Sequence, residues 1–247
     1  MKTSLALLTL ILAVLPLAGA RAAELQVIAG GGIAVPLNEI AAQFEKTSGH
    51  KVTIRYGTAP ELIVMSKAAF DMAVTPSEVF KDEGAAARLL PGPTTDIARV
   101  GLGVAVRAGA PKPDIASPEA LKQALLAART VATIPASAAG AQVMKLFERL
   151  GVADAVKAKL QAAANPAKLI ESVASGQAEL GLFLTNVLSA PGLDLVGPVP
   201  AAVDYQLVYT SGIAKDATQA EAARAFLAFL RSEPAKAVLT ARGLRPA

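Results

Sequence analysis

Four short segments of the chain place glycine, serine or threonine where a strand should end and a helix should begin. They read "AGGGIAVP" at positions 29–36, "YGTAPEL" at 56–62, "VTPSE" at 74–78 and "IPASAAGAQ" at 134–142. Glycine lets the backbone approach a ligand closely, and the first turn of a helix offers N–H groups that no helical carbonyl accepts. These residue types therefore indicate a site for a small anion. Each segment alone also fits an ordinary turn or helix cap that binds nothing.

Two common phosphate-binding patterns are missing from the glycine-rich segment. The G-x-G-x-x-G spacing of dinucleotide sites fails after Gly32, and no Gly-Lys-Ser/Thr follows as it does in a phosphate loop. The segment is therefore neither the dinucleotide fingerprint nor a phosphate loop, and a tight turn without a ligand stays the alternative to an oxyanion site.

Residues for proton transfer are few. The lone histidine, His50, follows the first expected helix and has no partner for a metal site or a catalytic triad, so we interpret it as a surface residue. A proton shift would have to use Glu61, Glu78, Thr58 or a tyrosine as its base. The residues themselves therefore favour a binding protein over an enzyme.

The elements around these segments alternate between strand and helix. Residues 25–29 form an expected buried strand, and residues 35–47 form an amphipathic helix that Gly49 ends. The same order of strand, small-residue loop and helix returns from position 130 onward. This alternation predicts an α/β protein with largely parallel sheets. In such sheets ligands bind at the carboxyl ends of the strands, which is where the four segments lie.

The first 22 residues have the pattern of a secretory signal peptide. Lys2 precedes an apolar run, and Ala20 and Ala22 suit cleavage after position 22. An uncleaved anchor is the alternative, but Pro16 interrupts the run too early for a comfortable membrane span. We therefore expect export to the periplasm and no membrane insertion of the mature chain.

The amino-acid composition limits the chemistry and the binding partners that the protein can have. The chain has no cysteine, which excludes disulfides, thiolate metal sites and a cysteine nucleophile. It has 24 Lys and Arg against 20 Asp and Glu, and the leader takes two basic residues away, leaving a mature net charge near +2. Such a charge gives no nucleic-acid footprint. We expect no cofactor and no metal.

The order of motifs resembles the periplasmic molybdate-binding proteins and their wider type II solute-binding relatives. The resemblance rests on "VIAGGGIAVPLNEIAAQFEKTSGHKVTIRYG", "ESVASGQAELGLFL" and "AARAFLAFLRSEPAKAVLTARGL". It implies a two-lobed type II periplasmic binding protein fold with hinge crossover strands, in a monomer that delivers its ligand to an ABC transporter. Residues 23–102 plus 204–247 would form one lobe and residues 103–203 the other.

The ligand set departs from that family. Its molybdate-binding hydroxyl side chains align with Gly32, Ala59 and Leu184 here, so an organic carboxylate is favoured over molybdate. The segment "DIARVGLGVAVRAGAPKPDI" is similar to a subgroup that includes bacterial aconitate isomerases, so an enzyme interconverting cis- and trans-aconitate is the alternative. Arg99 matches an arginine of that subgroup and could grip a carboxylate bidentately, or simply pair with Asp96.

One further residue remains open between capping and binding. Asn165 fits a helix cap and also matches a ligand-facing amide of the family. Together the patterns predict these ligand-binding residues: Gly31, Gly32, Thr58, Thr75, Arg99, Ser137, Gly140 and Asn165.

Overall fold

The computed structural model describes residues 22–92 and 94–247. The predicted signal peptide lies outside the described residues except for its last position, so it stays a prediction. Within the described part of the chain, no helix is both long enough and apolar enough to cross a membrane.

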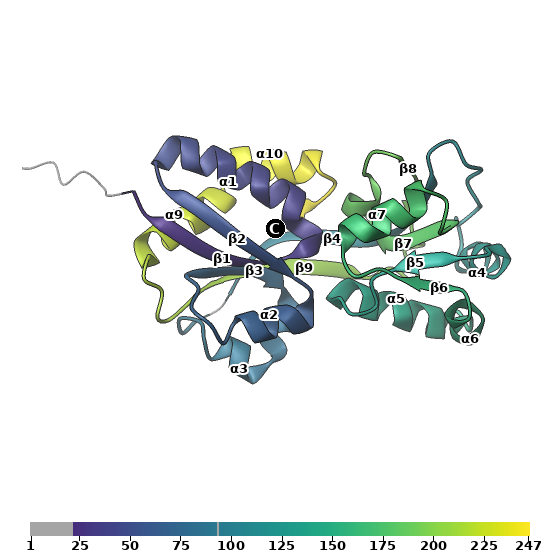
Figure 1. The fold of residues 1–247 in the computed structure, drawn as a ribbon, viewed down its shortest axis with the longest axis horizontal. Helices are drawn as coiled ribbons and strands as arrows, with labels where there is room; N and C mark the ends of the chain where they lie inside the picture. The colour runs from purple at the N-terminus through teal and green to yellow at the C-terminus, as the bar shows by residue number, and fades with distance from the viewer. Residues whose placement is uncertain (1–21, 93) are drawn as a thin grey trace, which may run out of the picture.

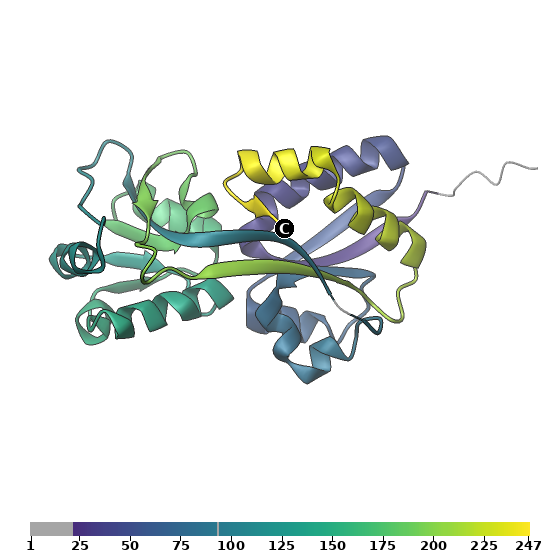
Figure 2. The same ribbon diagram turned by 180° about the vertical axis from the view of Figure 1, so that it is seen from behind.

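The chain folds into two α/β lobes that lie side by side and are joined by two long strands, β4 (Thr95–Arg107) and β9 (Gln206–Ile213) (Figures 1 and 2). The strands follow the order β2-β1-β3-β9-β4-β7-β5-β6, and β8 and β10 pair with β4. This is the predicted two-lobed architecture with crossover strands.

The first lobe contains three parallel strands, with β1 between β2 and β3. Its helix α1 begins and ends close to the predicted limits, and Gly49 closes it with a φ of 73° that favours glycine. The elements of this lobe are β1 (Glu24–Gly30), the 3-10 turn η1 (Gly31–Ile33), α1 (Ala34–Ser48), β2 (Lys51–Gly57), α2 (Ala59–Met65), β3 (Met72–Pro76), η2 (Ser77–Lys81), α3 (Glu83–Ala86), α9 (Ala220–Leu230), α10 (Glu233–Ala241) and β10 (Arg245–Pro246).

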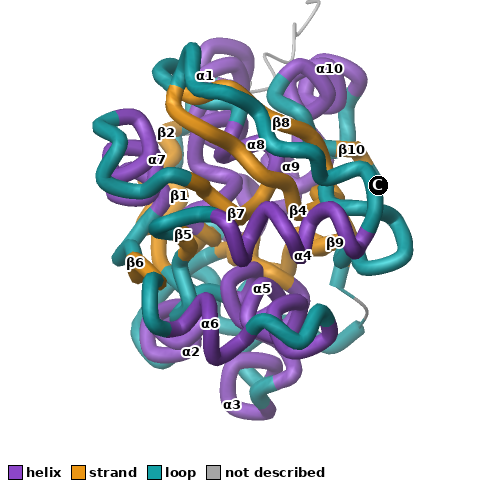
Figure 3. The backbone as a smooth tube through the Cα atoms, turned by 90° about the vertical axis from the view of Figure 1, so that its right-hand side faces the viewer, coloured by secondary structure: helices purple, strands orange, loops and turns teal. Residues whose placement is uncertain are grey.

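The second lobe repeats the same arrangement, with β5 between the parallel strands β6 and β7. Its elements are α4 (Pro118–Ala127), β5 (Val131–Thr133), α5 (Ala138–Arg149), α6 (Ala153–Lys157), β6 (Leu160–Ala162), α7 (Pro166–Ala174), β7 (Leu180–Leu184), α8 (Thr185–Leu188) and β8 (Leu193–Pro198). Figure 3 views this lobe from its free end, with α5 and α6 on one side of the strands and α7 on the other. The prediction of largely parallel sheets holds for three strands of each lobe, whereas β4, β8, β9 and β10 run antiparallel to their neighbours.

Strand β4 belongs to both lobes. Its residues up to Gly101 pair with β9, and its residues from Leu102 onward pair with β7. We therefore propose to divide the chain at this change of partner, with residues 23–102 and 204–247 in the first lobe and 103–203 in the second.

Apolar side chains cover both faces of the first sheet. Val27 and Ala29 face the core shared with α1, α9 and α10, whereas Ile28 and Ala73 face α2 and α3. This alternation within one strand follows from the two-residue period of β structure. A sheet covered on both faces leaves its strand ends as the place where a ligand can enter, and in this molecule those ends point toward the other lobe (Figure 1).

Candidate functional site

A cavity of about 950 Å³ lies between the two lobes, and we call it the cleft. Its walls are the starts of α1, α2, α5 and α7 together with α8 and the end of α10, so both lobes contribute to it. Among the lining residues are Gly31, Gly32, Thr58, Glu61, Ser137, Asn165, Asn186 and Arg242.

The structure brings five of the eight predicted site residues to the cleft: Gly31, Gly32, Thr58, Ser137 and Asn165. The other three, Thr75, Arg99 and Gly140, are not among its lining residues. The segments around β1, β2, β5 and α7, which come from both lobes, therefore meet at one cleft.

Three helix starts at the cleft already use their own side chains as caps. The Ser137 hydroxyl accepts a hydrogen bond from Gly140 N–H at 2.9 Å, and Asn165 Oδ1 accepts one from Lys168 N–H at 3.0 Å. At α2, Glu61 Oε2 accepts hydrogen bonds from the Thr58 N–H at 2.7 Å and the Thr58 hydroxyl at 2.8 Å. These groups therefore have less capacity left for a ligand than the sequence indicated.

The start of α1 differs from the other three. Among the described residues, no side chain caps η1 or α1, and no acidic residue lies in the first turn of either. Gly31 and Gly32 occupy this turn at the end of β1 and line the cleft. The first turn of a helix has N–H groups without helical acceptors and a partial positive charge. The glycine turn is therefore the part of the cleft best suited to an anion.

Gly32 has no room for a side chain. A Cβ built on it would lie 2.4 Å from the hydroxyl oxygen of Tyr209 and 2.8 Å from Leu184 Cδ1. Tyr209 comes from the crossover strand β9, and Leu184 from β7 of the second lobe. The same Cβ on Gly31 would meet nothing closer than 3.6 Å, at Pro166 Cδ. Close packing thus explains Gly32, whereas Gly31 tolerates a methyl group.

The lobes also meet through a hydrogen bond across the floor of the cleft. Asn186 Nδ2, in α8 of the second lobe, donates to the carbonyl oxygen of Gly32 at 2.7 Å. The Asn186 Oδ1 atom is buried and has no hydrogen-bond partner within the described residues. The sequence analysis missed Asn186, because its position right after a buried strand gives no sign of which lobe it contacts.

Thr75 and Gly140 pack inside the protein and do not line the cleft. Thr75 is fully buried on β3, opposite Thr210 of β9, and does not reach the cleft. Gly140 packs inside α5, where a Cβ would come within 1.8 Å of the Ile134 carbonyl oxygen. The pattern placed both residues correctly near strand ends, but it did not show which way they face.

Arg99 also lies away from the cleft. Its Nη2 forms an ion pair with Asp96 at 2.9 Å, and both side chains are more than two-fifths exposed. The structure therefore favours the alternative interpretation of Arg99, a surface ion pair.

Among the described residues, two charged ones line the cleft, Glu61 and Arg242. Two hydrogen bonds from Thr58 hold the pKa of Glu61 below its ordinary value, and the bond from the backbone N–H has the larger effect. The Glu61 carboxylate is therefore ionised at neutral pH. Arg242, at the end of α10, is the one Lys, Arg or His that the described residues bring to the lining. Sequence analysis missed it, although an arginine directly before the helix-ending Gly243 is a recognisable position.

Across residues 22–92 and 94–247, no group of three His, Cys, Asp or Glu side chains is arranged to hold a metal ion. The described lining of the cleft offers the backbone amides of the glycine turn and the guanidinium of Arg242, which are donors suited to anions.

Comparisons with known proteins agree with this architecture. A family model described as bacterial extracellular solute-binding protein matches residues 25–245. The aconitate isomerase of a Pseudomonas species is 32% identical over 98% of this chain and 96% of its own. The molybdate-binding protein ModA of Azotobacter vinelandii is 28% identical over 91% of this chain and 90% of its own.

Solved structures show the same fold. The periplasmic molybdate-binding protein of Azotobacter vinelandii superposes with a TM-score of 0.75 at 21% identity, covering 89% of this chain and 98% of its own. Peb3 of Campylobacter jejuni superposes with a TM-score of 0.65 at 14% identity, covering 90% of this chain and 99% of its own. At these identities the likeness concerns the fold alone.

Proposed function

We propose that this chain, which belongs to the family of bacterial extracellular solute-binding proteins, binds a small organic carboxylate in the cleft between its lobes. In this proposal the protein works as a monomer in the periplasm and hands its ligand to the permease of an ABC transporter. The observation that carries the proposal is the uncapped glycine turn at the start of α1, which faces a cleft with walls from both lobes.

The missing side chain at Gly32 and the presence of Glu61 in the cleft favour a carboxylate over molybdate. The side chain at Gly32 is absent, and Tyr209 fills the space where it would point. The Thr58 N–H and hydroxyl are both bound to Glu61, and the ionised Glu61 opposes a compact dianion nearby. A planar, extended carboxylate can keep its charge at a distance from Glu61.

A melting-shift screen tests the proposal. The purified mature protein is heated with molybdate, tungstate, sulfate, phosphate, citrate, cis-aconitate or trans-aconitate. Ligand at about a hundred times its dissociation constant stabilises the folded state by roughly 2.7 kcal/mol, so a carboxylate should raise the melting temperature. A shift with molybdate and none with the carboxylates would contradict the ligand class.

A second candidate is an isomerase that interconverts cis- and trans-aconitate in the same cleft. It is favoured by the aconitate isomerase relative at 32% identity and by Glu61, the one carboxylate that the described residues place in the lining. Both hydrogen bonds to Glu61 go to Oε2, and Oε1 has none within the described residues. Glu61 Oε1 would remove a proton from the methylene carbon, and the electron pair would spread over the allylic system. The proton would then return to the other end of that system.

One variant separates the two candidates. Glu61→Gln keeps a side chain that can cap Thr58 but removes the base. For the isomerase, turnover of cis-aconitate to trans-aconitate is lost while binding survives. For the binding protein, wild type shows no turnover, and the variant binds anions as well as or better than wild type because a like charge is gone. Turnover that is equal in wild type and Glu61→Gln would contradict the role of Glu61.

A further inference from the structure

We propose that Arg242 binds a carboxylate group of the ligand, through the edge of its guanidinium that the ion pair with Glu39 leaves open. This inference rests on the proposed function, and it names the side chain that selects a carboxylate within the cleft.

The position of Arg242 is set by two helices that are far apart in the sequence. It follows α10, and its side chain reaches back to Glu39 of α1, a residue 203 positions earlier in the chain. Gly243, with a φ of 77°, turns the chain away directly after it. Thr240, Ala241, Arg242 and Gly243 all line the cleft, so the arginine lies at its wall and not on a remote surface.

The hydrogen bonds of Arg242 leave one edge of the guanidinium free. Nε and Nη2 both donate to Glu39 Oε2, at 3.0 and 2.9 Å. A guanidinium carries five N–H donors in a fixed plane. The pair with Glu39 uses the edge formed by Nε and Nη2, so Nη1 and the second N–H of Nη2 form an open edge with two parallel donors. That geometry matches the two oxygens of a carboxylate.

Glu39 also fixes the orientation of this edge. Two donors on one acceptor oxygen restrict rotation of the guanidinium plane, so less conformational freedom is lost when a ligand binds. The Arg242 side chain is 50% exposed, so its open edge is accessible to a ligand.

The negative charge of Glu61 also favours a ligand position at the Arg242 end of the cleft. Glu61 lies at the start of α2, and Arg242 lies at the end of α10; these helices cover opposite faces of the first sheet (Figure 1). An anion between the lobes is repelled by the charge of Glu61 on the α2 side, whereas on the α10 side the charge of Glu39 is already matched by Arg242. A ligand with two or more carboxylates can therefore place one on Arg242 and another on the glycine turn of α1.

Calorimetric titration of four proteins tests the inference: wild type, Arg242→Gln, Arg242→Lys and Arg99→Gln. The probes are cis-aconitate, citrate and molybdate. Arg99 is the matched comparison, because it too is a half-exposed arginine paired with a carboxylate but lies outside the cleft. We expect Arg242→Gln to weaken tricarboxylate binding about tenfold or more, because a charge-assisted bidentate contact is lost. Arg242→Lys should bind the tricarboxylates more tightly than Arg242→Gln but more weakly than wild type. Arg99→Gln should bind them with wild-type affinity.

Several outcomes would overturn the inference. Equal tricarboxylate affinity of wild type and Arg242→Gln would do so, as would a loss in Arg99→Gln alone. If Arg242→Gln folds poorly, Arg242→Lys decides: it keeps the charge and the pair with Glu39, and wild-type affinity in that variant would contradict a need for the two-donor edge. Wild-type protein that binds no carboxylate of the melting-shift screen would instead contradict the proposed function itself.

Discussion

At the scale of single residues, the two cleft glycines give opposite predictions. Gly32→Ala places a methyl group against Tyr209 and Leu184, so we expect a loss of about 1–3 kcal/mol in the free energy of unfolding. Gly31→Ala, whose Cβ contacts stay at 3.6 Å or more, should change it by much less. Urea denaturation of both variants measures the difference.

A double variant checks the cause. Adding Tyr209→Phe to Gly32→Ala removes the closer of the two clashing atoms and should recover part of the loss. Additive effects of the two substitutions would show that the hydroxyl is not responsible.

Tyr209 also makes the free energy of unfolding fall as the pH becomes alkaline. Burial raises the pKa of its phenol above the ordinary value of 10.0, and the charge of Glu78 raises it further. Because the folded-state pKa is the higher one, the stabilisation is complete below about pH 10 and is lost as the pH rises from there through the folded pKa. We expect the urea midpoint of wild type to fall more steeply than that of Tyr209→Phe between about pH 9.5 and pH 11. Parallel slopes would contradict a buried, neutral phenol.

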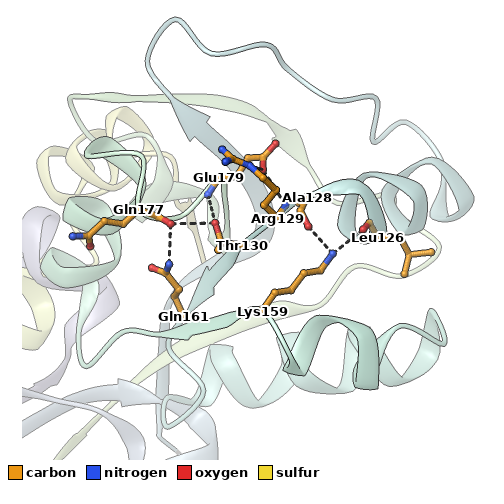
Figure 4. A network of polar contacts seen from close by, with 8 residues as sticks. All are labelled: Leu126, Ala128, Arg129, Thr130, Lys159, Gln161, Gln177 and Glu179. Carbon is orange, nitrogen blue, oxygen red and sulfur yellow. Dashed lines mark hydrogen bonds and ion pairs between the residues drawn. The ribbon is translucent and has the colours of Figure 1, made fainter.

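At the scale of elements, one lysine ties helix α4 to the strands of the second lobe. Lys159 Nζ donates to the carbonyl oxygens of Leu126 and Ala128, at 2.7 and 2.6 Å, where α4 ends (Figure 4). A cation at the carboxyl end of a helix satisfies free carbonyls and opposes the helix dipole.

Loss of this cap should destabilise the lobe. We expect Lys159→Met to lower the free energy of unfolding by about 1–2 kcal/mol, and hydrogen exchange should rise first at the end of α4. Lys157→Met is the matched control, because Lys157 is an exposed lysine of the neighbouring helix α6. An equal effect of both substitutions would mean that the cap contributes nothing specific.

The sequence predicted where elements begin and end better than what their side chains contact. Gly49, which ends α1 with a positive φ, has a local cause, so a local pattern reveals it. Thr75 lies near the end of β3, where the pattern put it, whereas Arg99 lies within β4; the face that each residue occupies depends on which strands pair with its own. Strand pairing is not a local property, so the sequence pattern did not show that both residues lie away from the cleft.

At the scale of the whole molecule, the crossover strands bring together residues from distant parts of the chain. Arg242 and Glu39 are 203 positions apart, and Asn186 reaches Gly32 across 154. The resemblance to solute-binding proteins predicted two lobes around a cleft, and the family match and fold agree with it. The contents of the cleft required the folded chain, because its one guanidinium comes from a helix end with no binding motif around it.

The most direct test of a carboxylate site between the lobes is a crystal structure of the protein grown with the carboxylate that gives the largest melting shift. We predict ligand density in the cleft, with one carboxylate against Gly31 and Gly32 and another on the open edge of Arg242. An empty cleft with the ligand bound elsewhere on the molecule would contradict the account.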